Sequence, residues 1–238
     1  MKTAGRPTVV LVHGAFADAS SWAGVISRLQ QNNVRALAVA NELRGGAYDG
    51  ARLAALLHDL EGPVVLVGHS YGGVVIAEAA SRASNVNSLV FVGAFALEEG
   101  ESPMDLLGRF PANDLGSALV PMALPGVGDA EETWLRIDES AYSKVFAADV
   151  DPTRAKVLAV SQRPILASAF DEKAGPAAWR TVPTHHLITA ADEAIPAEAQ
   201  RAMATRTGGT STEIAASHAV AVSRPGAVTA VILEALKD

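Results

Sequence analysis

One serine in this chain lies in a setting typical of a nucleophile. The stretch VVLVGHSYGGVVIAEAA, residues 64–80, places Ser70 after an apolar strand-like run and before an alanine-rich helix-like run. Residues 68–72 fit the pattern G-x-S-x-G, in which a sharp strand-to-helix turn lifts the serine hydroxyl above the edge of a sheet. Glycine suits the flanking positions, because side chains there would collide with the adjacent strand and helix. The alternative is a glycine-rich turn with an incidental serine, but the strand and helix on either side favour the nucleophile.

Such a serine needs a base, and His218 is the expected one. It follows the last expected strand in EIAASHAVAVSRP, at the carboxyl end of the sheet where Ser70 also lies. Reacting groups gather beyond the carboxyl ends of parallel strands, which favours this role over that of a structural loop histidine. The other histidines fit less well by position: His13 at the first strand–loop corner, His58 on a helix flank, His69 inside the turn, and His185 and His186 at the opposite end of the sheet.

The base needs an acid that orients it, and Asp192 is the expected residue. It follows the strand-like THHLITAA at a carboxyl end, and it keeps the chain order serine, acid, histidine. Glu193 is the neighbouring competitor, and Asp171 is a weaker candidate because it lies in the inserted segment between the two halves of the sheet. The alternative role for Asp192 is that of a turn or N-cap residue before the helix that begins near Pro196.

Two backbone N–H groups are expected to form an oxyanion hole beside the serine. One belongs to Tyr71, the residue after the nucleophile, and the other to the loop after the first strand, HGAFADASSW. Within that loop Ala15 is the expected donor and Phe16 is the alternative. Loss of one such donor costs about a hundredfold to a thousandfold in rate.

Strand-like and helix-like periods alternate along the chain and predict an α/β fold. Short apolar runs rich in β-branched residues indicate buried strands, and apolar residues at helical spacing separate them. Expected strands cover residues 8–14, 35–40, 63–69, 86–96, 184–190 and 210–216, and expected helices cover 18–32, 48–60, 72–83, 196–208 and 225–237. This order predicts a mostly parallel sheet with helices on both faces.

The segment 97–183 interrupts this alternation. It is broken by proline and glycine at first and then contains two stretches expected to be short helices, residues 151–162 and 163–175. We interpret it as a cap folded over one end of the sheet, within a single domain that spans residues 1–238. Its large apolar residues are expected to form the core of the cap and, in part, an apolar pocket: Leu106, Leu107, Phe110, Leu119, Met122, Leu124, Trp134, Phe146, Phe170 and Trp179.

Composition narrows the function classes. The 238 residues include 26 acidic and 19 basic ones, and the net charge of −7 argues against a nucleic-acid partner. The absence of cysteine excludes disulfides, thiolate catalysis and zinc–thiolate sites. The N-terminus shows no signal-peptide pattern and no apolar stretch reaches membrane length, so a soluble cytoplasmic protein without a membrane partner is expected.

The stretches LVHGAFADASSW, VGHSYGG, TAADEAIP and SHAV together resemble the α/β-hydrolase superfamily. Within it the pattern is most similar to small serine esterases related to plant hydroxynitrile lyases and methyl-ester hydrolases. The resemblance implies about six strands, and a mostly helical cap inserted before the last two. It also implies catalysis by Ser70, Asp192 and His218 with no cofactor and no metal.

Two departures from relatives of this fold narrow the chemistry that the resemblance implies. Hydroxynitrile lyases of this type carry a lysine after the base, where this chain has Ala219, and dehalogenases and epoxide hydrolases use an aspartate in place of Ser70. The expected reaction is hydrolysis of small to medium apolar carboxylic esters. Alternatives are a lactonase, a cofactor-free perhydrolase or haloperoxidase, and a non-catalytic small-molecule receptor. The expected partners are a small-molecule ester and, at most, a second copy of the chain in a homodimer.

Overall fold

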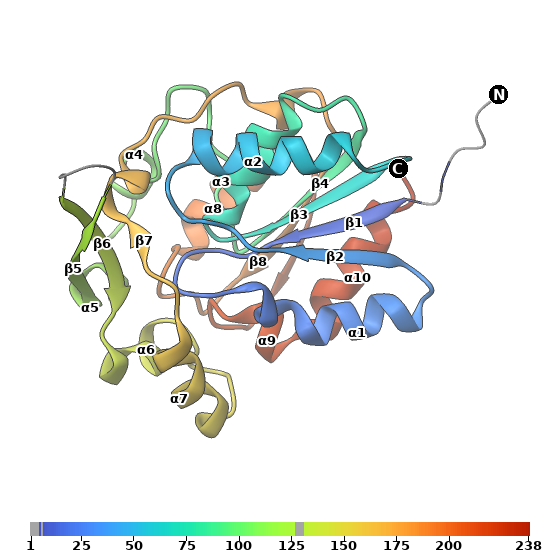
Figure 1. Cartoon of the computed structure of the whole chain (residues 1–238). Coiled ribbons are helices and arrows are strands. Elements are labelled where there is room, and N and C mark those ends of the chain that lie inside the picture. Colours follow the sequence, from blue (N-terminus) through green and yellow to red (C-terminus); the bar gives the residue numbers. More distant parts are fainter. Residues whose placement is uncertain (1–4, 6, 127–130) are drawn as a thin grey trace.

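The chain is built around a six-stranded parallel sheet with the strand order β2-β1-β3-β4-β8-β9 (Figure 1). The computed structural model describes residues 5, 7–126 and 131–238. The strands of this sheet are β1 (Thr8–Val12), β2 (Arg35–Val39), β3 (Val64–His69), β4 (Val86–Val92), β8 (Thr184–Thr189) and β9 (Thr210–Ile214). All residues of β1, β3 and β8 are buried, and the continuous apolar runs of β1 and β3 are typical of strands covered on both faces. The predicted fold class is confirmed.

Helices cover both faces of the sheet and close two separate cores (Figure 1). The helices α2, α3 and α8 pack on one face, around Leu57, Ile76 and Met203. On the other face α1, α9 and α10 pack around Leu29 and Ile232. The bounds of these helices are α1 (Ala23–Gln31), preceded by the 3₁₀ turn η1 (Ala19–Trp22), α2 (Gly46–His58), α3 (Gly72–Ala80), α8 (Ala197–Thr207), α9 (Val220–Ser223) and α10 (Pro225–Ala235).

The register of the sheet brings the carboxyl ends of its strands together along one edge, the edge at which the strands end. Val12 pairs with Gly68, and His69 pairs with Val92. Farther along the sheet, Thr189 pairs with Ile214. The loops that follow β1, β3, β8 and β9 therefore open on the same side, which is the arrangement that places reacting groups in parallel α/β sheets.

Most of the chain between β4 and β8 lies beyond this edge and forms the cap, and its last part returns along α3 to the start of β8 (Figure 1). Its elements are α4 (Pro103–Leu107), α5 (Leu115–Ala118), β5 (Leu119–Pro125), β6 (Glu131–Ile137), α6 (Glu139–Val145), α7 (Pro152–Ser161), β7 (Ile165–Leu166), η2 (Ala167–Phe170) and η3 (Ala178–Arg180). The helix expected over residues 151–162 is present as α7. The helix expected over residues 163–175 is wrong, since the chain there pairs Ile165 and Leu166 with β6 and then forms a single 3₁₀ turn.

The cap also contains a three-stranded antiparallel sheet, β5-β6-β7, that the sequence pattern did not predict. Pro121 and Pro125 lie in β5, an edge strand, which is where a sheet tolerates the missing backbone N–H. The prolines, and the absence of any fully buried position in β5, weaken its alternating pattern in the sequence. Half-buried and exposed residues alternate along much of β5 and β6, as expected for a sheet with one packed face and one face exposed to solvent.

Candidate active site

Ser70 lies at a strained turn between β3 and α3. Its backbone φ is +54°, a left-handed conformation that is costly for a residue with a side chain. The turn is so tight that a Cβ at Gly68 would lie 2.5 Å from the carbonyl oxygen of Gly72. The Phe95 N–H donates to the Ser70 carbonyl at 3.2 Å and helps to hold this geometry. The G-x-S-x-G stretch therefore has the backbone conformation that its glycines predicted.

Asp192 and His218 are in direct contact. The His218 Nδ1 lies 2.7 Å from Asp192 Oδ2, and both side chains are almost fully buried. The Asp192 carboxylate also accepts hydrogen bonds from the Thr189 hydroxyl, the Gln200 amide and the backbone N–H groups of Ala194 and Ile195. Burial alone would raise the pKa of Asp192, but its contact with His218 and the hydrogen bonds from Thr189 and Ile195 hold that pKa below its ordinary value.

The competing acids and histidines lie elsewhere. Glu193 and Asp171 are exposed, and neither contributes to the contact with His218. His58 is exposed on α2. At the opposite end of the sheet, His185 bonds to Asp238 at 2.8 Å and His186 bonds to Thr207 at 2.9 Å. Of the six histidines, His218, the expected base, is the one that contacts Asp192, the expected acid.

His69 holds the loop that carries His218. Its Nε2–H donates to the His218 carbonyl at 2.8 Å, and the two rings lie 4.7 Å apart. Burial, together with the charge of His218, lowers the pKa of His69 to about 3, so this ring stays neutral and a donor at neutral pH. The Phe146 ring packs on the other histidine, 4.8 Å from the ring of His218. The sequence analysis placed His69 inside the turn but found no role for it.

The loop after β1 passes directly beside Ser70. A Cβ at Gly14 would lie 2.6 Å from the Ser70 Cβ and 3.2 Å from its Oγ. The Phe16 N–H is engaged, since it donates to the carbonyl of Arg163 at 3.1 Å. Within the described residues, no acceptor bonds to the N–H of Ala15 or to that of Tyr71. Of the two candidate donors in this loop, the geometry therefore favours Ala15 over Phe16.

The side chain of Tyr71 points away from the reacting groups and into the core. Its hydroxyl donates to Asp49 Oδ2 on α2 at 2.9 Å, and the same oxygen accepts from the backbone N–H groups of Arg44 and Gly45. Burial raises the pKa of both Asp49 and Tyr71. This buried contact links α2 to the turn that carries Ser70.

Ser70 and His218 line one small cavity of about 30 Å³, together with Ala15 and Phe16. It adjoins a larger cavity of about 680 Å³ under the cap, because Leu107, Leu115, Phe170 and Ala194 line both. The remaining walls of the larger cavity are mostly apolar: Met104, Gly108, Phe110, Pro111, Ala112, Asn113, Gly116, Leu119, Leu135, Ala167, Asp171 and Pro196. Several cap residues singled out in the sequence thus line this space, while Trp179 packs within the protein and donates to the carbonyl of Leu97.

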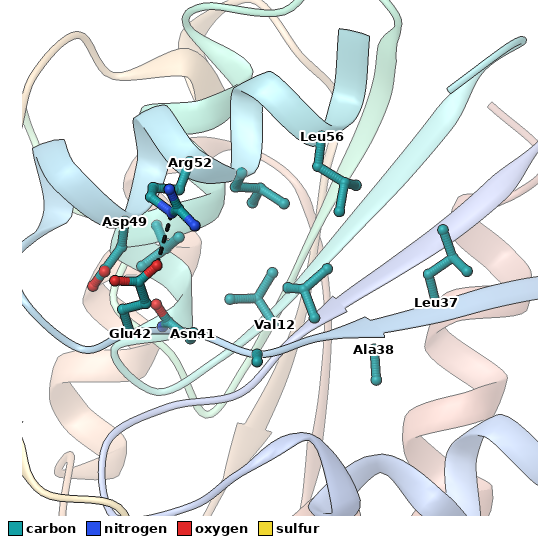
Figure 2. A pocket seen from close by; sticks show the side chains of 12 residues that line it. Val12, Leu37, Ala38, Asn41, Glu42, Asp49, Arg52 and Leu56 are labelled. Atoms are coloured by element: carbon teal, nitrogen blue, oxygen red, sulfur yellow. Dashed lines mark ion pairs between the residues drawn. The ribbon is translucent and has the colours of Figure 1, made fainter. Parts of the chain in front are cut away.

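A separate cavity of about 340 Å³ lies between β2 and α2 (Figure 2). Figure 2 shows Arg52 paired with Glu42 near Asp49, at the polar end of this cavity. The Arg52 Nε atom lies 2.7 Å from Glu42 Oε1. Its lining residues include neither a histidine nor a hydroxyl side chain, and none of the six nominated site residues is among them. Its two carboxylates, Glu42 and Asp49, are engaged with Arg52 and with the Tyr71 hydroxyl.

Thr189 and Gln200 are functional residues that the sequence analysis missed. Thr189 lies three residues before Asp192 at the end of β8, and a polar residue closing an apolar strand is a signal that sequence alone offers. Gln200 lies on α8 and reaches Asp192 only through the packing of that helix on the sheet. No sequence signal marks it.

The described residues contain neither a metal-binding cluster nor a membrane-spanning helix. No group of three or more histidine, aspartate or glutamate side chains there is placed to hold a metal ion. In the same residues, no helix combines the length and the apolar character needed to cross a bilayer.

Comparison with known proteins gives consistent matches over the chain. The profile of a family described as "Alpha/beta hydrolase family" matches residues 9–231. A carbendazim hydrolyzing esterase from Nocardioides sp. (strain SG-4G) is 34% identical over 113 residues, which make up 42% of this chain and 47% of that protein, less than half of its length. The α/β hydrolase nvfD of Aspergillus novofumigatus (strain IBT 16806) is 25% identical over 97% of this chain and 96% of its own. The crystal structure of polyneuridine aldehyde esterase superposes with a TM-score of 0.82 at 17% identity, covering 98% of this chain and all of that one.

Proposed function

The chain belongs to the α/β-hydrolase family, and from this premise we propose that it is a serine esterase that cleaves carboxylic esters through an acyl-enzyme on Ser70. The observation that carries the proposal is the pairing of His218 with Asp192 beside a cavity that His218 shares with Ser70. A neutral imidazole whose Nδ1–H is held by a carboxylate presents its Nε2 as a base. The relative from Nocardioides is a carbendazim hydrolyzing esterase, which supports the same class of reaction.

The mechanism follows from these positions. The Nε2 of His218 takes the hydroxyl proton of Ser70 as the oxygen attacks the ester carbonyl, and the backbone N–H groups of Ala15 and Tyr71 stabilise the resulting oxyanion. His218 then gives the proton to the departing alcohol. Water, deprotonated by the same ring, releases the acid from Ser70 and restores the hydroxyl. The Asp192 carboxylate stabilises the imidazolium in both steps.

The large cavity under the cap supports a preference for uncharged, apolar esters. Its walls are formed mainly by side chains such as Phe110 and Leu119, and a charged group there would lose water without gaining a partner. Small to medium groups fit a volume of about 680 Å³, which is within the usual range for small-molecule sites. The cytoplasmic location and the division of the chain into one domain with a cap at residues 97–183 stay predictions, as does the expectation of at most a homodimer.

An activity screen with a Ser70→Ala blank tests the proposal. Purified protein is assayed on nitrophenyl esters of increasing acyl length, on lactones, and on acetate with hydrogen peroxide. We expect ester turnover in the wild type and a loss of about 10⁶-fold in kcat in Ser70→Ala. Turnover that survives this substitution contradicts the mechanism. Slow labelling of Ser70 by a fluorophosphonate would instead indicate the non-catalytic receptor.

A further inference from the structure

Phe16, next to the expected oxyanion donor Ala15, has an unusual backbone conformation. Its φ is +60°, in the left-handed region that residues with bulky side chains rarely adopt. Such a conformation persists only where surrounding contacts impose it. The contacts that impose it here come from the cap.

Both backbone polar groups of Phe16 are bonded to cap residues. The Tyr142 hydroxyl, on α6, donates to the Phe16 carbonyl at 3.2 Å, and the Phe16 N–H donates to the Arg163 carbonyl at 3.1 Å. Tyr142 is almost fully buried. Burial, with a smaller contribution from the charge of Asp18, raises the pKa of the Tyr142 hydroxyl, so it remains a donor throughout the ordinary assay range.

The Arg163 carbonyl is itself held firmly. The neighbouring Gln162 side chain accepts from the Ile137 N–H and donates to the Ile137 carbonyl, both at 2.8 Å, which fastens this stretch to β6. Pro164 follows Arg163 and restricts the residue before it to extended conformations. The acceptor for the Phe16 N–H therefore has a defined orientation.

The same part of the cap also reaches the loop of the base. The Phe146 carbonyl, just after α6, accepts from the Ala219 N–H at 2.8 Å. The Phe146 ring packs at a tilt against Tyr142, with 5.0 Å between ring centres, and lies edge-on to the His218 ring at 4.8 Å. One short segment, residues 142–146, therefore contacts both the loop of the oxyanion hole and the loop of the base.

We infer that Tyr142 is a positioning residue: with the Arg163 carbonyl it holds Phe16 left-handed and so aims the Ala15 N–H at the oxyanion. The inference rests on the proposed function and extends it, because it makes the cap a part of the oxyanion hole in addition to a cover for substrate. The Phe16 N–H belongs to the peptide group that joins Ala15 to Phe16. Its hydrogen bond to Arg163 fixes the orientation of that peptide group, and with it the backbone on the carboxyl side of Ala15. Tyr142 contacts no reacting atom and acts through Phe16.

Tyr142→Phe tests this inference, because it removes one hydroxyl and keeps the ring. Loss of a complete oxyanion donor costs about a hundredfold or more, so partial misplacement is expected to lower kcat about tenfold with KM changed less than about twofold. The inhibition constant of a trifluoromethyl ketone, which forms an oxyanion on Ser70, is expected to rise in parallel. That of the matching methyl ketone, which binds without this adduct, is expected to stay unchanged.

Thr229→Val is the matched control, since it also removes one hydroxyl-to-carbonyl hydrogen bond, from α10 outside the site. It is expected to lower the urea midpoint as Tyr142→Phe does, with wild-type kcat. Pro164→Ala is a second variant that loosens the Arg163 carbonyl, and it is expected to shift kcat and the trifluoromethyl ketone constant in the same direction. If Tyr142→Phe does not fold, Pro164→Ala still tests whether the contact of the cap with Phe16 sets the oxyanion donor, and wild-type values in it overturn the inference.

The inference is overturned if folded Tyr142→Phe and Pro164→Ala proteins keep wild-type kcat and wild-type affinity for the trifluoromethyl ketone. It is also overturned if Thr229→Val loses activity to the same extent, because the effect would then follow general stability. Failure of the proposed function would be seen separately, as a wild-type protein without Ser70-dependent turnover.

Discussion

Replacing Asp192 with asparagine is expected to lock His218 in the wrong tautomer. The Oδ1 atom of Asp192 accepts from the N–H groups of Ala194 and Ile195, at 2.8 and 2.9 Å. Backbone N–H groups only donate, so in the variant the amide oxygen has to occupy this position. The amide NH₂ group then occupies the Oδ2 position, 2.7 Å from His218 Nδ1 in the wild type.

The Thr189 hydroxyl can rotate to accept from this NH₂ group. The Gln200 amide cannot flip, because its Oε1 accepts from the Thr189 N–H at 3.0 Å and its Nε2 donates to the Ile195 carbonyl at 2.8 Å, so its hydrogen bond to position 192 is lost. His218 Nδ1 has to accept a hydrogen bond, so the ring proton moves to Nε2, and a protonated Nε2 cannot take the proton of Ser70. Wrong-tautomer substitutions of this kind lower kcat by about 10⁴-fold in serine hydrolases, which corresponds to a barrier increase of about 5.4 kcal/mol.

The assay is kcat for a nitrophenyl ester at pH 8, with the urea midpoint measured to show that Asp192→Asn folds. Glu193→Gln is the matched control, because it makes the same chemical change at the exposed neighbour and is expected to leave kcat within twofold. Long-range ¹H–¹⁵N spectra of the imidazole should show the proton on Nδ1 in the wild type and on Nε2 in the variant. A variant within tenfold of wild-type kcat, or one with the proton still on Nδ1, refutes the reasoning.

Three further outcomes are expected. Burial lowers the pKa of His69 to about 3 and that of His186 to about 4, so below pH 6.5 only the unfolded chain binds these protons. The free energy of unfolding should therefore fall by about 1.4 kcal/mol per pH unit for each ring between pH 6.5 and about 4, and urea midpoints that stay level from pH 7 to 5 would contradict this. Leu107→Trp fills part of the cavity under the cap and should raise KM for esters with long acyl chains about tenfold, with KM for acetate esters unchanged. An equal rise in KM for both kinds of ester would show that the acyl chain binds elsewhere. Tyr71→Phe leaves the buried Asp49 carboxylate without one donor and should lower the free energy of unfolding by about 1–3 kcal/mol. An unchanged urea midpoint would show that this contact does not stabilise the fold.

The cap shows where prediction from sequence reaches its limit. Its short helix α7 was predicted, because Asp151 and Pro152 provide a helix start that can be read over a few residues. The pairing of β5 with β6, and of β6 with Ile165 and Leu166, was missed. Strand pairing depends on a partner distant in the chain, and the prolines in β5 weaken the only local signal.

The sequence by itself determined the parallel sheet and nominated Ser70, Asp192 and His218, because buried strands, sharp turns and strand ends leave patterns within a few residues. Only the tertiary structure decided which groups surround them. Gln200 reaches Asp192 from α8, and Tyr142 reaches Phe16 across 126 positions of the chain. Such contacts depend on how helices and the cap pack on the sheet, and a side chain that acts through packing carries no local pattern of its own. For the same reason, the choice of Ala15 over Phe16 as an oxyanion donor depended on one hydrogen bond, which the Phe16 N–H donates to the cap.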